Sequence, residues 1–465
     1  MISHLNFKRF DDSVLITNDF GRYQFLTMDQ FADLLDNRLS ASDPVYAELR
    51  KNFFIIEKSE DLLSEDRIHA IQEMKSYLFS GTSLHIFAVT NACNLNCVYC
   101  QAKDKGSKLC GYMSEETGIK AIHLALQSPS KELTFEFQGG EPLLNFDVIR
   151  KMILESERQK GNKQISYTLV SNLRLLTEDK LDFLEQYKVN VSTSLDGPRN
   201  VQEYNRRTNG NESSYDIVEA GYRRLKERGI AAGGIETTTR YSLQFPEDIV
   251  NTYLNMGIPG IFIRPLTPLG FAKADWEVLG YQPEEFLQFY RKAFARILEI
   301  NMQGTFFPEY LAVYFLKKIL QGFSMNYMEL RSPCGAVTGQ LSYYYDGNVY
   351  TCDEGRMVAE MGDNAFKLGT VDSSYDELVE SPVCKATQAA SVIESLPTCS
   401  DCVYQPYCGV CPVVTYAAEG DIFPRSPGGF RCRIYKGIQD MIFEYLKKAD
   451  PEIISVFYGW IGEER

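Results

Sequence analysis

Residues 84–100 have the sequence LHIFAVTNACNLNCVYC, and the fold can be predicted from them. Its first part, Leu84–Thr90, alternates as a β-strand does, and the loop behind it carries three thiols, Cys93, Cys97 and Cys100. Structural zinc sites and 4Fe-4S clusters are closed by four ligands, so three thiolates leave one position for a ligand from outside the protein. The stretch therefore predicts an open iron site behind a strand. The alternative is a zinc knuckle that lacks one ligand.

Five further apolar, β-rich segments follow the strand Leu84–Val89, and a helical pattern comes after each of them. The segments are Leu133–Phe137, Ile165–Val170, Val189–Ser194, Ala231–Thr238 and Ile261–Arg264. Ser114 and Thr177 carry side-chain oxygens that suit the start of a helix, and Gly257 suits a helix end. Six alternations of strand and helix predict an α/β fold with a parallel sheet. Ligands of such folds bind where the strands end, so the residues just past each strand are the candidates.

Polar residues follow three of these strands. The second strand runs into Gln138-Gly139-Gly140-Glu141-Pro142, where glycines allow close backbone approach to a ligand and a carboxylate can accept hydrogen bonds from an ammonium group. The third is followed by Ser171-Asn172, and the fourth by Ser194-Leu-Asp-Gly-Pro198 and then Arg206. The alternative for all of them is ordinary turn chemistry.

A second group of cysteines lies in the last third of the chain: Cys334, Cys352, Cys399, Cys402, Cys408, Cys411 and Cys432. Seven ordered thiols exceed the needs of one metal site, and a zinc ribbon is the alternative to iron-sulfur clusters. Cys110 and Cys384 stand apart from both groups, and a small buried apolar role is the alternative for each of them.

The composition narrows the function classes. The chain has 465 residues, 12 cysteines, 4 histidines and a formal net charge of -14, which argues against nucleic acid as a partner and against a His-rich hydrolytic centre. A chain this long needs no disulfide staples. Neither a signal peptide nor a membrane-spanning apolar run is expected, so the predicted location is the cytoplasm.

The spacing Cys-x3-Cys-x2-Cys, with Tyr99 before the last cysteine, resembles the signature of radical S-adenosylmethionine (SAM) enzymes. The resemblance implies a partial (β/α)6 barrel in which Cys93, Cys97 and Cys100 hold a 4Fe-4S cluster whose fourth iron binds SAM. By the same resemblance Gly139, Gly140 and Glu141 match the motif for the SAM amine, and Tyr99, Asn172, Ser194 and Arg206 are further cofactor-binding residues.

The C-terminal cysteines resemble the SPASM extension of this family, which carries two auxiliary 4Fe-4S clusters. The resemblance gives one cluster Cys399, Cys402, Cys408 and Cys432, and the other only Cys334, Cys352 and Cys411. Asp353, Cys384, Cys110 or a substrate atom could supply the missing ligand, and Asp353 is also the catalytic candidate. Two residues, where many members have three, separate Cys408 from Cys411.

Several stretches resemble the radical SAM maturases of the His-Xaa-Ser peptide system: Ser83–Phe87, Glu136–Asn145, Ser192–Pro198, Ile261–Ala272, Tyr345–Met357 and Ala359–Asp363. One departure is Cys411, where members often carry an acid. This resemblance implies an oxidative modification, such as a crosslink, of a ribosomally made precursor peptide, with flavodoxin or ferredoxin as electron donor. The alternatives are a protein-modifying SPASM enzyme of the sulfatase-maturase kind and a non-enzymatic iron-sulfur or zinc-binding protein.

Four segments are expected: an N-terminal α+β module (1–80), the barrel (81–325), the SPASM region (326–440) and a helical tail (441–465). Within the first, Val14–Leu26 predicts a hairpin that turns at Asp19–Gly21, followed by a helix over Met28–Asn37. Such a module resembles the peptide-recognition elements of peptide maturases, which would capture a leader peptide along a strand edge. The alternative is an extension that caps the barrel.

Overall fold

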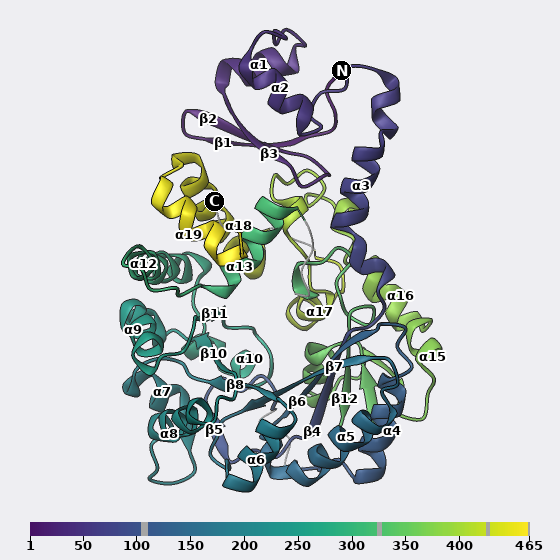
Figure 1. Cartoon of the computed structure of the whole chain (residues 1–465), viewed down its shortest axis with the longest axis vertical. Coiled ribbons are helices and arrows are strands. Elements are labelled where there is room, and N and C mark those ends of the chain that lie inside the picture. Colours follow the sequence, from purple (N-terminus) through teal and green to yellow (C-terminus); the bar gives the residue numbers. More distant parts are fainter. Residues whose placement is uncertain (104–109, 323–327, 425–427, 464–465) are drawn as a thin grey trace.

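The computed structural model describes residues 1–103, 110–322, 328–424 and 428–463. Six parallel strands form its centre, in the order in which the chain makes them (Figure 1). They are β4 (Leu84–Thr90), β6 (Glu132–Gly139), β7 (Gln164–Ser171), β8 (Asn190–Ser194), β10 (Ala232–Thr238) and β11 (Phe262–Pro265). Neighbouring strands pair in parallel throughout. The predicted α/β fold with its six strands is therefore confirmed.

Helices connect the strands and cover one face of the sheet: α4 (Glu115–Ala125), α5 (Phe146–Gln159), α6 (Glu178–Gln186), α7 (Arg199–Asn205), α8 (Ser214–Glu227) and α9 (Pro246–Met256). Ser114 caps α4 by accepting a hydrogen bond from the Thr117 amide, as expected. Thr177 precedes α6, but its hydroxyl donates to Asp179 instead of capping the helix. Gly257 ends α9 with a φ of 72°, a left-handed conformation that favours glycine.

Side chains alternate between the two faces of the central strands. In β6, Leu133, Phe135 and Phe137 are buried in the apolar cluster that also contains residues of α4 and α5. Thr134, Glu136 and Gln138 lie between them and are only half-buried. Strands β7 and β8 alternate in the same way. Because alternate residues of a strand point to opposite faces, the partial barrel has an apolar outer face and a polar, accessible inner face.

Three strands of the C-terminal third extend the same sheet beyond β4: β12 (Gln340–Tyr344), β13 (Asn348–Tyr350) and β14 (Lys367–Thr370). β12 pairs in parallel with β4, and the other two follow as antiparallel strands. The expected boundary between residues 325 and 326 lies outside the described residues. The segment behind it shares a sheet with the barrel, so the two are not spatially separate.

The C-terminal third also contains α14 (Asp353–Glu360), α15 (Tyr375–Val379), α16 (Pro382–Ala389), α17 (Pro412–Glu419), α18 (Phe430–Lys448) and α19 (Pro451–Ile461). The expected boundary between residues 440 and 441 falls within α18. Between β11 and this region lie α10 (Gly270–Ala274), α11 (Trp276–Leu279), α12 (Pro283–Met302) and α13 (Tyr310–Leu316).

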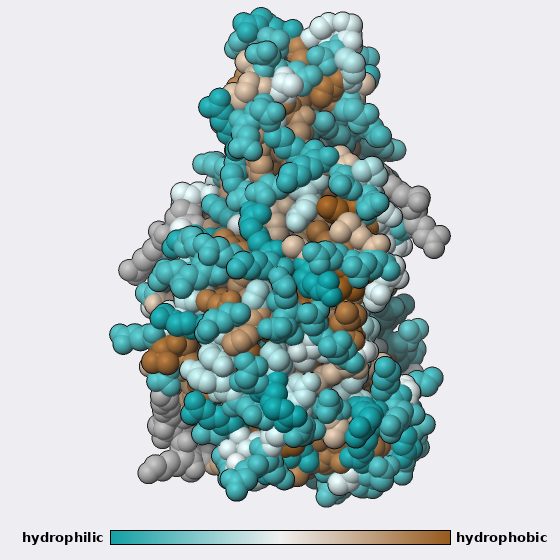
Figure 2. All heavy atoms as spheres, turned by 90° about the vertical axis from the view of Figure 1, so that its left-hand side faces the viewer, coloured by the Kyte–Doolittle hydropathy of each residue, from teal (hydrophilic) through white to brown (hydrophobic). Residues whose placement is uncertain are grey.

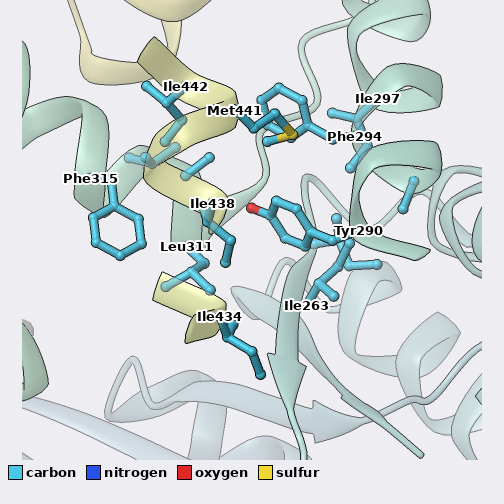
Figure 3. Close-up of a cluster of buried hydrophobic side chains, with 14 of the residues drawn as sticks. Ile263, Tyr290, Phe294, Ile297, Leu311, Phe315, Ile434, Ile438, Met441 and Ile442 are labelled. Carbon is cyan, nitrogen blue, oxygen red and sulfur yellow. The ribbon is translucent and has the colours of Figure 1, made fainter. Parts of the chain in front are cut away.

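A large apolar cluster joins the end of the barrel to the C-terminal helices. Figure 3 shows Ile434, Ile438, Met441 and Ile442 of α18 facing side chains of α12, α13 and β11. Among these, Tyr290, Phe294 and Leu311 are at most 1% exposed. Burying such side chains contributes about 1.5–3 kcal/mol each, so α18 is firmly fixed to the barrel.

The N-terminal module is a three-stranded antiparallel sheet with helices beside it: β1 (Asn6–Phe10), β2 (Ser13–Thr17), β3 (Tyr23–Thr27), α1 (Met28–Leu35), α2 (Pro44–Lys51) and α3 (Glu65–Met74). The predicted hairpin corresponds to β2 and β3, and the predicted helix to α1. In Figure 1 the module lies at one end of the molecule, beside the C-terminal helices. In the view of Figure 2, the molecule narrows towards this end and its surface is largely hydrophilic, with separate apolar patches.

None of the helices in the described residues combines the length and the apolar character that crossing a membrane requires.

Candidate active site

The loop with three cysteines starts where β4 ends, at the carboxyl edge of the sheet. Its middle forms β5 (Leu95–Cys97), which pairs with β9 (Arg206–Thr208) so that Cys97 stands opposite Arg206. All three thiols are half-buried. Burial raises the pKa of Cys93 and of Cys97 to about 11, and a neighbouring loop thiol adds to the shift in each case. The loop therefore places the three sulfurs close together.

Gly139 and Gly140 hold this loop against the end of β6. The Gly140 amide donates to the Thr90 carbonyl at 2.8 Å, and the Glu141 amide donates to the Ala92 carbonyl at 2.8 Å. A Cβ on Gly140 would lie 2.1 Å from the Ala92 carbonyl oxygen. The glycines were expected to let a ligand approach the backbone. What approaches it in the structure is the start of the cysteine loop.

The Glu141 carboxylate is 1% exposed and joins the ends of β6 and β7. Its Oε1 accepts from the Leu143 amide at 3.0 Å and from the Ser171 hydroxyl at 2.7 Å, and its Oε2 accepts from the Asn172 amide at 2.9 Å. A carboxylate has about four acceptor positions. Three are used by these hydrogen bonds, so one position, on Oε2, is unused among the described residues.

Tyr99, Asp196 and Arg206 form a buried, hydrogen-bonded group beside the cysteine loop. Tyr99 donates its hydroxyl to Asp196 at 2.8 Å, and Arg206 forms an ion pair with the same carboxylate at 3.0 Å. The Arg206 guanidinium also lies over the Tyr99 ring, 5.2 Å from its centre. Arg206 was expected to bind the SAM carboxylate. In the structure it pairs with Asp196, and its buried Nε has no hydrogen-bond partner among the described residues.

Asp196 was not predicted as a site residue. An Asp before Gly-Pro is a common turn former, so the sequence indicates only a turn at this position. Asp196 is 0% exposed and also accepts from the Thr237 amide of β10 at 3.2 Å. This carboxylate therefore ties the cysteine loop to the ends of two strands.

The other expected SAM contacts lie around the same loop. The Asn172 side chain donates to the side chain of Asn94 at 2.8 Å. Asn94 stands between Cys93 and Cys97 in the loop. Ser194 is half-buried at the last position of β8. The loop behind β11 reaches the cysteines from the other side, since the Phe271 amide donates to the Cys100 carbonyl at 2.8 Å.

The inner face of the barrel carries charged side chains that were not predicted as site residues. Glu136 of β6 lies on this face, and burial, followed by the nearby Asp353 carboxylate, raises its pKa to about 7. Arg264 of β11 is half-buried, and its positive charge opposes that shift. Both residues lie within strands, where a sequence pattern gives no sign that a polar residue faces a site.

The C-terminal thiols fall into two groups. Cys399, Cys402, Cys408 and Cys432 influence one another electrostatically, and Lys436 lies close to all four. A cavity of about 180 Å³ runs from this group to the end of β11 and is lined by Cys399, Cys408, Cys432, Arg264, Glu329 and Arg431, among others. The remaining three thiols, Cys334, Cys352 and Cys411, belong to a separate apolar cluster.

The three other candidates for the auxiliary site lie elsewhere or are engaged. Asp353 accepts from the Arg356 guanidinium at 2.8 Å. Cys384 is 4% exposed and packs in the apolar cluster on the outer face of the sheet. Cys110 is exposed. The alternative of a small, buried apolar residue therefore fits Cys384 but not Cys110.

The arrangement of the loop thiols suits an iron-sulfur cluster. Within the described residues, no three His, Cys, Asp or Glu side chains converge on a point where a single metal ion would sit. A 4Fe-4S cluster makes a different demand, because each of its irons takes its own thiolate. Three neighbouring thiols from one loop fit such a cluster, with one iron left for SAM.

Comparison with known proteins agrees with this geometry. Residues 87–253 match the family model of the radical SAM superfamily, a range that includes the cysteine loop and most of the barrel. An uncharacterized protein of Methanocaldococcus jannaschii, MJ0907, is 31% identical over 191 residues, which are 41% of this chain and 65% of that protein. A cysteine-type anaerobic sulfatase-maturating enzyme of Clostridium perfringens is 24% identical over 278 residues, 58% of this chain and 74% of that enzyme. The chain thus spans slightly less than two thirds of the first of these relatives.

Two solved structures share the fold over most of the chain. The structure of anSMEcpe with bound AdoMet aligns with a TM-score of 0.69 and 22% identity, covering 80% of this chain and 100% of that one. The structure of Streptococcus suis SuiB bound to its precursor peptide SuiA aligns with a TM-score of 0.56 and 14% identity, covering 92% of this chain and 99% of that one.

Proposed function

We propose that this chain, a radical SAM enzyme of the SPASM type, is a peptide maturase that installs an oxidative side-chain modification, such as a crosslink, in a ribosomally made precursor peptide. The observation that carries the proposal is the loop of Cys93, Cys97 and Cys100 at the carboxyl edge of six parallel strands, above a polar inner face. The proposed cofactors are SAM and three 4Fe-4S clusters. One is held by these loop thiols and two by the C-terminal groups.

When bound, the first cluster and SAM supply a 5′-deoxyadenosyl radical, which takes hydrogen from an unactivated carbon. The residues of the chain bind and orient the reactants. Glu141 has one acceptor position for the SAM ammonium group, and Asp196 fixes Tyr99 and Arg206 behind the cluster. Glu136, on the inner face, can hold or release a proton near neutral pH.

We propose the N-terminal module as the binding site for the leader part of the precursor peptide. Ten of the seventeen exposed large apolar side chains in the described residues lie within residues 1–80. Exposed apolar side chains such as these are available to pack against another polypeptide. The three-stranded sheet pairs with no further strand among the described residues, and an extended peptide could add to it as a strand.

The module also contacts the loop that carries Cys399 and Cys402. The Asn6 side chain of β1 donates to the Ser400 carbonyl at 2.9 Å and to the Cys402 carbonyl at 3.2 Å. The Thr17 hydroxyl of β2 donates to the Val403 carbonyl at 2.7 Å. A leader bound to this sheet would therefore lie close to the C-terminal thiols. The contacts also fit the alternative of an extension that caps the barrel, and a binding experiment distinguishes the two.

Replacing Ile68 and Ile71 with serine is expected to weaken leader binding about tenfold. The two side chains lie on one face of α3 and are 42% and 47% exposed. A bound leader would bury them, and losing that apolar contact costs about 1–2 kcal/mol of binding free energy. Fluorescence anisotropy of a labelled leader peptide measures the dissociation constant. Leu154→Ser, at a site on α5 that is 46% exposed, is the matched control. Equal affinity of the unchanged protein, the double variant and the control would contradict leader binding at α3. If the leader still binds after the module is deleted, the module caps the barrel and does not bind the leader.

The sulfatase-maturase kind of activity is the second candidate. The fold of anSMEcpe is the closer of the two solved folds by TM-score, whereas the SuiB alignment extends over more of this chain, 92% against 80%. A peptide maturase needs a site for a leader, and the role proposed above for the N-terminal module would supply one. A flavodoxin or ferredoxin as electron donor and a cytoplasmic location stay predictions.

The proposal is tested with the anaerobically purified protein, SAM, a strong reductant and the short peptide encoded beside its gene. Mass spectrometry is expected to show that the peptide loses hydrogen, as an oxidative crosslink requires. A peptide of unchanged mass would argue against oxidative modification. Oxidation of a sulfatase Cys or Ser peptide, with no change in the neighbouring precursor, would favour the sulfatase-maturase alternative.

A further inference from the structure

Arg206 stands directly opposite Cys97 in the short sheet that carries the cysteine loop. β5 and β9 are antiparallel with Cys97 and Arg206 as partners, and next to them the Val98 amide donates to the Asn205 carbonyl at 2.9 Å. Hydrogen bonds join alternate pairs of antiparallel strands, so Cys97 and Arg206 form the pair without them, in which side chains are closest. The Cβ atoms of such partners lie about 4.5–5.5 Å apart on one face. The register therefore brings the Arg206 side chain beside that of Cys97.

The Arg206 guanidinium is buried and held in place from two sides. The residue is 8% exposed, and its Nη2 pairs with the Asp196 carboxylate at 3.0 Å. The guanidinium also lies over the Tyr99 ring, and the Tyr99 hydroxyl donates to the same carboxylate. These contacts fix a permanent positive charge next to the cysteine loop.

One N–H group of this guanidinium is unused. The buried Nε has no hydrogen-bond partner among the described residues. Within the side chain, Nε is closer to β9 than Nη2 is, so it lies on the Cys97 side of the contact with Asp196. A buried donor without a partner is costly. A thiolate that binds iron is negatively charged and accepts a charge-assisted hydrogen bond, so the Cys97 sulfur suits this N–H.

A cation beside a ligand sulfur has a known effect on an iron-sulfur cluster. Reduction adds one negative charge to the cluster, and hydrogen bonds to its sulfurs and the net charge around it set its reduction potential. In a buried place, water and salt screen such charges little. Asp196 opposes the effect of Arg206, but it is bound at the far end of the guanidinium. The arrangement therefore favours the reduced cluster.

We propose that Arg206 raises the reduction potential of the cluster held by Cys93, Cys97 and Cys100, by donating its Nε hydrogen to the Cys97 sulfur and keeping a positive charge beside it. The inference rests on the proposed function, which supplies this cluster. It gives Arg206 a role toward the cluster, in contrast to the expected contact with the SAM carboxylate.

The test is a redox titration of the full, iron-loaded chain without SAM, in which electron paramagnetic resonance follows the reduced clusters. The signal of the first cluster is the one that disappears when the three loop cysteines are replaced by alanine. Arg206→Met combined with Asp196→Asn removes both charges of the pair, and asparagine can still accept from Tyr99. At a fixed potential, the ratio of reduced to oxidised first cluster is expected to fall about tenfold, which is about 59 mV for one electron.

Two single variants complete the comparison. Arg206→Met alone leaves the Asp196 charge uncompensated, so its midpoint potential is expected to be lower still. Arg207→Met is the matched control, because Arg207 is the next residue of β9, is exposed and stands opposite Asn96. Successive residues of a strand point to opposite faces, so Arg207→Met is expected to leave the midpoint unchanged.

An unchanged midpoint in the double variant would overturn the proposal, and weaker SAM binding by that variant would then assign Arg206 to SAM. Equal shifts in Arg206→Met and Arg207→Met would also overturn it, because the effect would then be that of any nearby charge. If the double variant binds less iron, Arg206→Gln with Asp196→Asn keeps a hydrogen-bonded pair without charges, and its midpoint decides in the same way. An unchanged protein with no iron-sulfur signal from the loop would instead contradict the proposed function, and this inference with it.

Discussion

Replacing Cys93, Cys97 and Cys100 together with alanine is expected to abolish SAM cleavage and to remove about one third of the iron. The three thiols stand in one loop at the carboxyl edge of the sheet, and in the proposed function they hold one of three clusters of four irons. Iron analysis and chromatographic detection of 5′-deoxyadenosine measure the two effects.

Cys384→Ala is the matched control for this experiment. Cys384 is 4% exposed within the apolar cluster on the outer face of the sheet, so its loss should leave iron content and SAM cleavage unchanged. Appreciable SAM cleavage by the triple variant would contradict the role assigned to the loop. Iron loss caused by Cys384→Ala would show that this thiol is a ligand after all.

Gly140→Ala is expected to have the second largest effect, namely loss of the first cluster in a protein that is otherwise folded. The added Cβ would lie 2.1 Å from the Ala92 carbonyl oxygen and 2.7 Å from that of Asn91, which are backbone atoms beside Cys93. Overpacking of this kind costs about 1–3 kcal/mol, and the cysteine loop is the part that can move to relieve it. Iron analysis and the SAM cleavage rate are the measurements.

Gly210→Ala is the control, because nothing lies within 4 Å of a Cβ at that position. It is expected to keep both the iron and the activity. If Gly140→Ala also kept both, the glycine pair would not be what holds the cysteine loop in place.

The strands and helices of the barrel could be predicted from the sequence because local patterns determine them. Apolar alternation gave β4 and β6, and the conformational preference of glycine marked the end of α9 at Gly257. The extension of the sheet by β12–β14 was not predicted. Pairing of β12 with β4 joins residues about 250 positions apart in the chain, which no local pattern encodes.

The site was only partly predictable for the same reason. Spacing identified the loop thiols, whereas the roles of neighbouring residues depend on contacts across the fold. Glu141 was expected to bind the SAM amine, which stays a prediction, but its hydrogen bonds with Ser171, Asn172 and Leu143 could not be predicted. Arg206 was expected to bind the cofactor, which stays a prediction, and its ion pair with Asp196, a carboxylate of the protein, could not be predicted.

The most direct test of the central claim is the formation of 5′-deoxyadenosine from SAM by the reduced, iron-loaded protein, with and without the precursor peptide encoded beside its gene. The account predicts that the peptide raises 5′-deoxyadenosine formation well above the peptide-free level and that modified peptide accumulates with it. An iron-loaded, reduced protein that cleaves no SAM under either condition would contradict the account.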